Sequence, residues 1–182
     1  MQLLPKVLND EIDLTWREFD RAARHLDLAR TLNPNDAMVQ ITWASVQACL
    51  GHPGRGLEAA EFARRINPLH PGWYSYYRSR ILFLLGRYEE AAAILEESTR
   101  ANPLQHPQDL AWCAAGCGHL GRTEQASQCA GRFLQSVRGL WRGDPAAGPE
   151  VYVNWLADAS NLRRPEDEMR LREGLRLAGI PA

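Results

Sequence analysis

The sequence predicts an all-α solenoid of stacked helical hairpins, because two dipeptides recur at a nearly constant interval. A Leu-Gly pair occurs at residues 50–51, 85–86 and 120–121, at a spacing of 35 residues each time. An Asn-Pro pair occurs at residues 33–34, 67–68 and 102–103, at spacings of 34 and 35 residues. A period of this length is typical of arrays in which each repeat is one helical hairpin.

Each of these markers has a physical role at a helix end. Glycine enters the left-handed conformation without steric cost, so the Gly of each Leu-Gly pair is predicted to end the first helix of a hairpin. Glu89 and Glu90 then fall in the first turn of the second helix, where the helix dipole favours negative charge. The proline of each Asn-Pro pair disfavours a helical residue before it, which ends the second helix. Small residues, at 44 and 56 and again at 79 and 91, are predicted where paired helices cross closely.

These markers divide the chain into a solenoid over residues 1–138, a loop over 139–149 and capping helices over 150–182. Within the solenoid we expect a partial repeat at 1–34 and full repeats at 37–68, 72–103 and 107–138. The partial repeat has a helix over 3–12 and a second from Trp16 to Leu32, whose inner face carries Phe19, Ala22, Leu26 and Ala29. The capping helices cover about 150–160 and 165–178, and they place Tyr152, Trp155 and Leu156 over the open end of the array.

The incomplete first repeat bears on how the chain begins. A solenoid that starts with a partial repeat would expose the apolar face of Phe19 and Leu26. This pattern favours a segment cut from a longer protein, and whether Met1 is the native start stays open.

Composition and charge narrow the function classes. The chain has 182 residues, of which 45% are hydrophobic, and a formal net charge of −1. A nucleic-acid protein held by phosphate contacts, or a polybasic membrane binder, would carry an excess of basic residues. The sequence has no apolar stretch long enough to span a membrane and no signal-peptide pattern at its start. Four cysteines are too few for a disulfide scaffold, so we expect a cytoplasmic protein with reduced thiols.

The repeat pattern resembles that of tetratricopeptide (TPR) proteins. The resemblance covers about residues 14–138 and is carried by Gly86-Arg-Tyr-Glu-Glu-Ala91, Gly121-Arg-Thr-Glu-Gln-Ala126 and the closing Asn-Pro pairs. The tryptophan usual near the start of each repeat is displaced, because Trp73 comes two residues early and Ser75 holds its place. The resemblance implies a right-handed TPR-type solenoid of about 3.5 repeats with a two-helix C-terminal cap.

A narrower resemblance concerns two segments of the chain. Asn67-Pro-Leu-His-Pro-Gly-Trp-Tyr74 together with Gly174-Leu-Arg-Leu-Ala-Gly-Ile-Pro181 is similar to the C-terminal TPR segments of bacterial class III adenylate/guanylate cyclases. Some winged-helix transcriptional regulators carry similar tails. The cyclase catalytic domain is absent from this sequence. The resemblance therefore implies a regulatory interaction region of a bacterial signalling protein.

In TPR arrays the first helix of each repeat lines a concave groove, and the resemblance implies that a partner protein or peptide binds there. Repeat two supplies aromatic residues and an arginine, which are enriched at binding hot spots. Arg80 would pair with a carboxylate, and Trp73 and Tyr76 would supply apolar contact. The expected partner-binding residues are Trp73, Tyr76, Tyr77, Arg80, Phe83, Met38, Ile41, Ser45 and His119. The groove lacks the Asn and Lys pattern of TPR domains that clamp chaperone tails.

Other functions stay open as alternatives. The array could be a structural spacer or a self-association module that forms homo-oligomers. Trp73, Phe83 and Leu84 could instead pack against neighbouring repeats or against C-terminal helices folded back into the groove. Cys113, Cys117 and Cys129 could bind zinc, although packing in the hairpin core is the interpretation we favour. No nucleophile, triad or acid–base pair is assembled by the repeat pattern, so we expect no enzyme activity, no cofactor and no metal.

Overall fold

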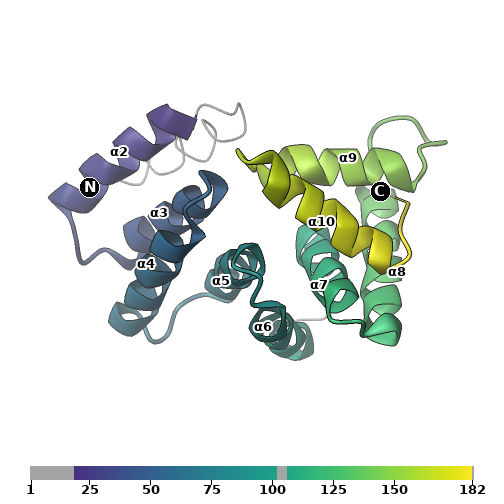
Figure 1. The fold of residues 1–182 in the computed structure, drawn as a ribbon. Coiled ribbons are helices and arrows are strands. Elements are labelled where there is room, and N and C mark those ends of the chain that lie inside the picture. The colour runs from purple at the N-terminus through teal and green to yellow at the C-terminus, as the bar shows by residue number, and fades with distance from the viewer. Residues whose placement is uncertain (1–18, 102–105, 182) are drawn as a thin grey trace.

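The computed structural model describes residues 19–101 and 106–181 and is all-helical over these ranges (Figure 1). This confirms the predicted fold class. The predicted helix over 3–12 lies outside the described residues. The helices are α2 (Phe19–Leu32), α3 (Ala37–Cys49), α4 (Pro53–Ile66), α5 (Trp73–Leu84), α6 (Tyr88–Ala101), α7 (Pro107–His119), α8 (Thr123–Leu140), α9 (Pro149–Ser160) and α10 (Pro165–Leu177). None of them is long and apolar enough to cross a membrane.

The three Leu-Gly pairs end α3, α5 and α7 as predicted. Gly51, Gly86 and Gly121 have φ angles of 90°, 73° and 69°, a region that side chains with a Cβ rarely enter. The amide of Gly51 then donates to Ala48 O at 3.0 Å, and the next amide donates to Gln47 O at 2.8 Å. These bonds satisfy carbonyl groups that the helix end would otherwise leave unpaired.

The paired helices of a hairpin cross at small residues. A Cβ built on Gly56 of α4 would lie 2.7 Å from Ala44 O of α3, so the two backbones meet with no room for a side chain. In the next hairpin, Ser79 of α5 and Ala91 of α6 are 1% and 2% exposed. The apolar core continues from hairpin to hairpin through residues such as Phe83, whose ring meets Trp112 edge-on at 5.0 Å between centroids.

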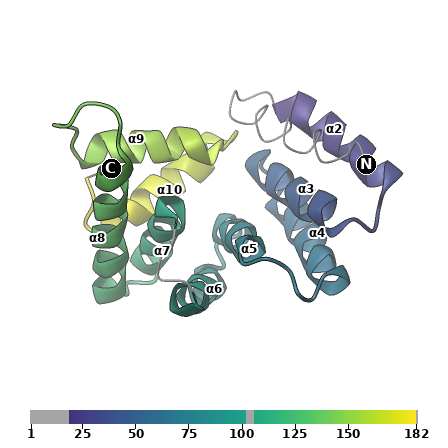
Figure 2. The same ribbon diagram turned by 180° about the vertical axis from the view of Figure 1, so that it is seen from behind.

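The hairpins form an arc whose inner side is lined by the first helix of each repeat. Figures 1 and 2 show α3, α5 and α7 along the inside of the arc, with α4, α6 and α8 outside them. The last two helices do not continue this stack. α10 instead crosses the inner face over α7 (Figure 1), so the chain's own C-terminal hairpin occupies one end of the concave side.

Candidate functional site

The concave surface of repeat three is covered by α10. Gly174 of α10 lies so close to α7 that a Cβ built on it would be 2.7 Å from Ala115 O and 2.8 Å from Ala115 Cβ. On α7, Gly118 meets the Gly174 carbonyl and Leu177 in the same way. Small residues on both helices therefore allow the two backbones to touch, and no peptide-sized space remains over α7.

Polar contacts fix the hairpin in this position. A ring nitrogen of His119 lies 2.9 Å from Arg170 O, and the Arg170 guanidinium donates to Leu84 O at 2.7 Å. At the turn between α9 and α10, the amide of Arg163 donates to Cys49 O of α3 at 2.9 Å. The C-terminal hairpin thus contacts all three inner helices, and it closes the concave groove at one end.

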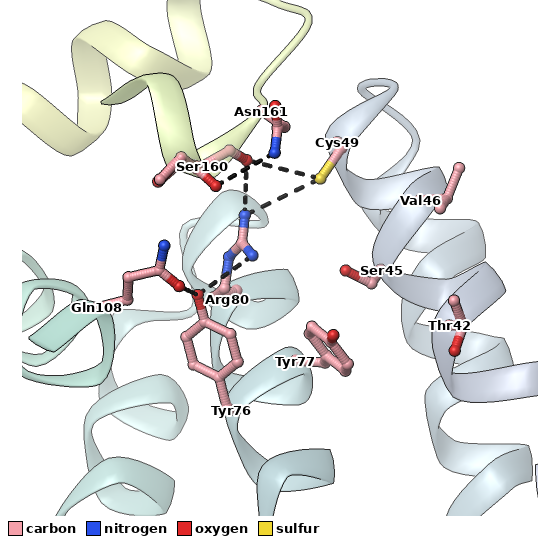
Figure 3. A pocket seen from close by; sticks show the side chains of 11 residues that line it. Thr42, Ser45, Val46, Cys49, Tyr76, Tyr77, Arg80, Gln108, Ser160 and Asn161 are labelled. Atoms are coloured by element: carbon pink, nitrogen blue, oxygen red, sulfur yellow. Dashed lines mark hydrogen bonds between the residues drawn. The ribbon is translucent and has the colours of Figure 1, made fainter. Parts of the chain in front are cut away.

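A pocket remains between α3, α5 and this turn. Its volume is about 170 Å³, and Figure 3 shows Cys49, Arg80 and Ser160 meeting there. The lining residues are Thr42, Ser45, Val46 and Cys49 of α3, Tyr76, Tyr77 and Arg80 of α5, Gln108 of α7, Ala159 and Ser160 at the end of α9, and Asn161 of the turn.

Arg80 dominates the chemistry of this pocket. Its side chain comes from the middle of α5 and is only 8% exposed. One terminal nitrogen donates to Ser160 O at 2.8 Å and the other to the Tyr76 hydroxyl at 3.3 Å. The guanidinium also lies over the rings of Tyr76 and Trp112, at 5.3 and 5.0 Å from their centroids. None of these partners carries a charge.

The neighbouring groups stay neutral at physiological pH. Burial raises the pKa of the Tyr76 hydroxyl and of the Cys49 thiol, in spite of the opposing effect of Arg80 on both. Tyr76 then donates its proton to Gln108 Oε1 at 2.9 Å. Among the described residues no carboxylate forms a direct ion pair with Arg80, and the acidic group it interacts with at longer range is Asp109, whose pKa burial raises and Arg80 helps to lower.

Three buried polar atoms of the pocket residues make no hydrogen bond to any described residue. They are a donor, Arg80 Nε, a hydroxyl, Ser160 Oγ, and an acceptor, Asn161 Oδ1. A buried polar atom without a partner costs roughly 1–3 kcal/mol, so such atoms are rare in native proteins. All three atoms belong to residues that line this pocket.

The predicted partner-binding residues divide into two groups. Ser45, Tyr76, Tyr77 and Arg80 line the pocket, and Trp73 is half-buried beside it with its ring 5.5 Å from that of Tyr77.

The remaining four lie elsewhere. Ile41 and Phe83 are 0% and 1% exposed and pack in the core. Met38 packs against Ala29 and Val39, and His119 lies under α10, stacked on the ring of Tyr88.

The sequence analysis did not identify the contribution of the C-terminal turn. Ser160 and Asn161 complete the pocket, although they lie 80 and 81 residues beyond Arg80 along the chain. One signal was present, since an Asn after a helix often adopts the left-handed conformation and ends it. Asn161 has a φ of 51° and is the C-cap of α9.

The cysteines considered as zinc ligands lie inside the third hairpin. Cys113 and Cys117 are 4% and 0% exposed, and Cys129 is half-buried on α8. Within residues 19–101 and 106–181, no three His, Cys, Asp or Glu side chains are arranged to hold a metal ion. The three cysteines therefore lie inside the hairpin, with Cys113 and Cys117 in its core, as we expected.

Comparison with known proteins identifies the fold. No family profile matches the chain, and no curated protein matches it in sequence. Solved structures do match over nearly the whole chain. A chain of MamA from Desulfovibrio magneticus RS-1 that runs from residue 41 to the end is 17% identical with a TM-score of 0.62, and the match covers 98% of this chain and 94% of that one.

Two further structures agree. TPR-like repeats of a kinesin light chain from Podosopora anserina are 18% identical with a TM-score of 0.61, covering 97% of this chain and 94% of that one. YrrB, described as a TPR protein with an unusual peptide-binding site, is 15% identical with a TM-score of 0.57, covering 97% and 90%. The chain therefore has the fold of a TPR-type helical-repeat solenoid, with a C-terminal hairpin returned onto its concave face.

Proposed function

We propose that the chain is a non-catalytic protein-interaction module that binds an acidic segment of a partner protein in the pocket at Arg80. TPR folds serve as interaction scaffolds, and the concave face is where such scaffolds present their binding residues. The pocket lies on that face, between the helices that the array places on its inner side.

The buried charge of Arg80 is the observation that carries this proposal. An ionised group removed from water is costly unless an opposite charge compensates for it. Arg80 is 8% exposed, it is always protonated, and its partners among the described residues are a carbonyl, a phenol and a thiol. A carboxylate from a ligand would supply the missing charge and would accept from Nε, which has no acceptor.

The size of the pocket favours a peptide side chain as the ligand. The volume of about 170 Å³ is below that of typical small-molecule sites and suits a single side chain. The rings of Tyr77 and Trp73 flank the opening and can pack against residues next to that side chain.

A paired peptide selection tests the proposal. Two libraries of random octapeptides would be offered to the purified chain, one with a fixed central Asp or Glu and one with the matching Asn or Gln. We expect the wild-type protein to enrich the acidic library. Arg80→Met, which keeps the apolar stem and removes the charge, should lose this preference.

A matched arginine provides the control. Arg87 lies in the turn before α6 and pairs with Glu90 at 2.6 Å, so Arg87→Met removes an equal charge outside the groove. It should leave the selection unchanged. A folded Arg80→Met protein that still prefers acidic peptides would overturn the proposal.

We further infer that the module is a regulatory region of a bacterial signalling protein, a cyclase or a transcriptional regulator, and that it acts in the cytoplasm. Support comes from the resemblance of residues 67–74 and 174–181 to cyclase tails. It also comes from the preference for arginine over lysine, because Lys6 is the single lysine of the chain. Reading the gene upstream of Met1 tests the inference. A cyclase or winged-helix domain in frame is the expected result, and a stop codon in its place would contradict it.

Self-association is the second candidate function, and a specific surface favours it. Val137, Leu140, Trp141 and Trp155 line an apolar cavity of about 390 Å³ between α8 and α9, and the Leu140 side chain is 62% exposed. Tyr152 is 2% exposed and cannot contact another copy directly. Light scattering distinguishes the candidates, because a concentration-dependent dimer that Leu140→Ser abolishes would favour self-association, and a monomer at all concentrations would exclude it.

A further inference from the structure

Two cysteine sulfurs of the third hairpin lie in direct contact. Cys113 Sγ of α7 and Cys129 Sγ of α8 are 2.7 Å apart. A disulfide bond requires about 2.05 Å between the sulfurs. The two sulfurs therefore already lie within an ångström of bonding distance.

We propose that Cys113 and Cys129 form a site of reversible oxidation, at which hydrogen peroxide converts the two thiols into an intramolecular disulfide. This site is separate from the pocket at Arg80, and the inference does not depend on the proposed function. We assign the disulfide to this pair because the two sulfurs already lie next to each other.

The environments of the two thiols assign their roles. Cys129 is half-buried, so peroxide reaches it from solvent, whereas Cys113 is 4% exposed. A hydrogen bond from the Cys113 thiol lowers the pKa of Cys129, in spite of the opposing effects of burial, Cys117 and Glu96, and Arg132 adds to the lowering. The thiolate is the reactive form of cysteine, so Cys129 is the group that attacks the oxidant.

The reaction balances in two steps. The Cys129 thiolate attacks one oxygen of peroxide, the O–O bond breaks, and the leaving hydroxide takes a proton to become water, which leaves a sulfenic acid on Cys129. The Cys113 sulfur then attacks Cys129 Sγ, the S–O bond breaks, and the hydroxyl leaves as water with the Cys113 proton. Peroxide is reduced by two electrons, and the two thiols lose them.

Cys117 is the competing partner and is the less suitable one. It lies one helical turn after Cys113 on the same helix, and it is 0% exposed. The neighbouring Cys113 thiol also lowers the pKa of Cys117, but the buried Cys117 sulfur has no route to peroxide from solvent. A bond between Cys113 and Cys129 joins α7 to α8, and it would therefore hold together the hairpin on which α10 packs.

Peptide mapping of the full chain tests the proposal. The protein would be reduced, treated with peroxide, alkylated and digested with trypsin without reductant. The expected product has lost two hydrogen atoms and links the tryptic peptide 101–122, which contains Cys113 and Cys117, to the peptide 123–132, which contains Cys129. A thiol reductant should restore the separate peptides.

Two variants assign the sulfurs. Cys117→Ser keeps the proposed pair and should give the same link, whereas Cys129→Ser should give none, with helicity checked by circular dichroism in both. Cys49 lies in another tryptic peptide and should remain available to alkylation throughout. The proposal is overturned if the wild-type protein keeps four free thiols, links Cys113 to Cys117, or forms its disulfide between two copies.

Discussion

Gly118→Ala tests whether α10 lies on the concave face, because this substitution adds one methyl group where the two helices touch. The added Cβ would meet the Gly174 carbonyl oxygen, with Leu177 Cβ at 3.1 Å and Ala178 N at 3.2 Å. Two of these three neighbours are backbone atoms. The clash therefore cannot be relieved by rotating a side chain, and α10 has to move away from α7.

The size of the effect follows from two opposing terms. Alanine is favoured over glycine by about 1 kcal/mol in a helix interior, and this is an upper limit for Gly118, which lies in the last turn of α7. Overpacking costs about 1–3 kcal/mol, and contact with backbone places this site at the upper end of that range. We therefore expect Gly118→Ala to lower the free energy of unfolding by about 2 kcal/mol.

Gly116 of the same helix provides a matched control. A Cβ there has only Phe83 Cδ2 within reach, at 3.9 Å, which is an ordinary contact. Gly116→Ala should stabilise the protein by up to about 1 kcal/mol through helix propensity alone. Urea unfolding followed by circular dichroism measures both variants. Equal stabilities for the two would refute the placement of α10.

Three further predictions concern the core, a buried hydrogen bond and the thiols. Ala91→Leu should destabilise the protein by about 1–3 kcal/mol by overpacking the α5–α6 crossing, whereas Glu90→Gln on the surface should stay within about 0.5 kcal/mol; equal costs in thermal unfolding would contradict the assigned register. Asp27→Ala removes the carboxylate oxygen that accepts a hydrogen bond from the indole N–H of Trp43 at 2.8 Å. In urea unfolding it should lower the free energy of unfolding by about 1–3 kcal/mol, and Asp27→Asn should lower it by less. As the pH is raised, the alkylation rate of Cys129 should increase at a lower pH than that of Cys49, because the pKa of Cys129 is lowered by a hydrogen bond and that of Cys49 is raised by burial. If Cys49 were alkylated at the lower pH, these environments would be contradicted.

The repeat architecture could be predicted because its signals are local. Gly51, Gly86 and Gly121 each end a helix by a backbone conformation that few other residues adopt, and their spacing then fixes the period. The close crossing at Ala44 and Gly56 follows from side-chain size in the same way. These features involve residues at most a few turns apart, so no knowledge of distant contacts was needed.

The position of the C-terminal hairpin was left open by the sequence, which offered folding back into the groove as one alternative, and the structure adopts that alternative. The small residues Ala115 and Gly118 leave the concave side of repeat three open, and the structure fills this space with another helix. Gly174 was a signal that the sequence analysis did not use. A glycine inside a helix weakens the helix and often marks a close approach of another backbone. Its partner lies about 60 residues away along the chain, and one sequence alone does not pair such positions.

The same contact explains why only part of the candidate site was predictable. Arg80 was identified from its residue type and repeat position, but its environment depends on the turn at Ser160. The turn removes the guanidinium from solvent and reduces a long groove to one pocket. A surface arginine would bind an anion weakly, whereas a buried arginine without a direct ion-pair partner is expected, on the proposed function, to make the pocket selective for charge.

A double-mutant cycle across the pocket tests the central claim most directly. An octapeptide chosen by the acidic selection would be measured against wild-type protein and Arg80→Met by fluorescence polarisation, each with the peptide's Asp or Glu and with the matching amide. A direct charged contact predicts a coupling free energy of about 1.5–3 kcal/mol between the protein and peptide substitutions. Additive effects, within about 0.5 kcal/mol for two folded proteins, would show that Arg80 does not receive the carboxylate and would contradict the account.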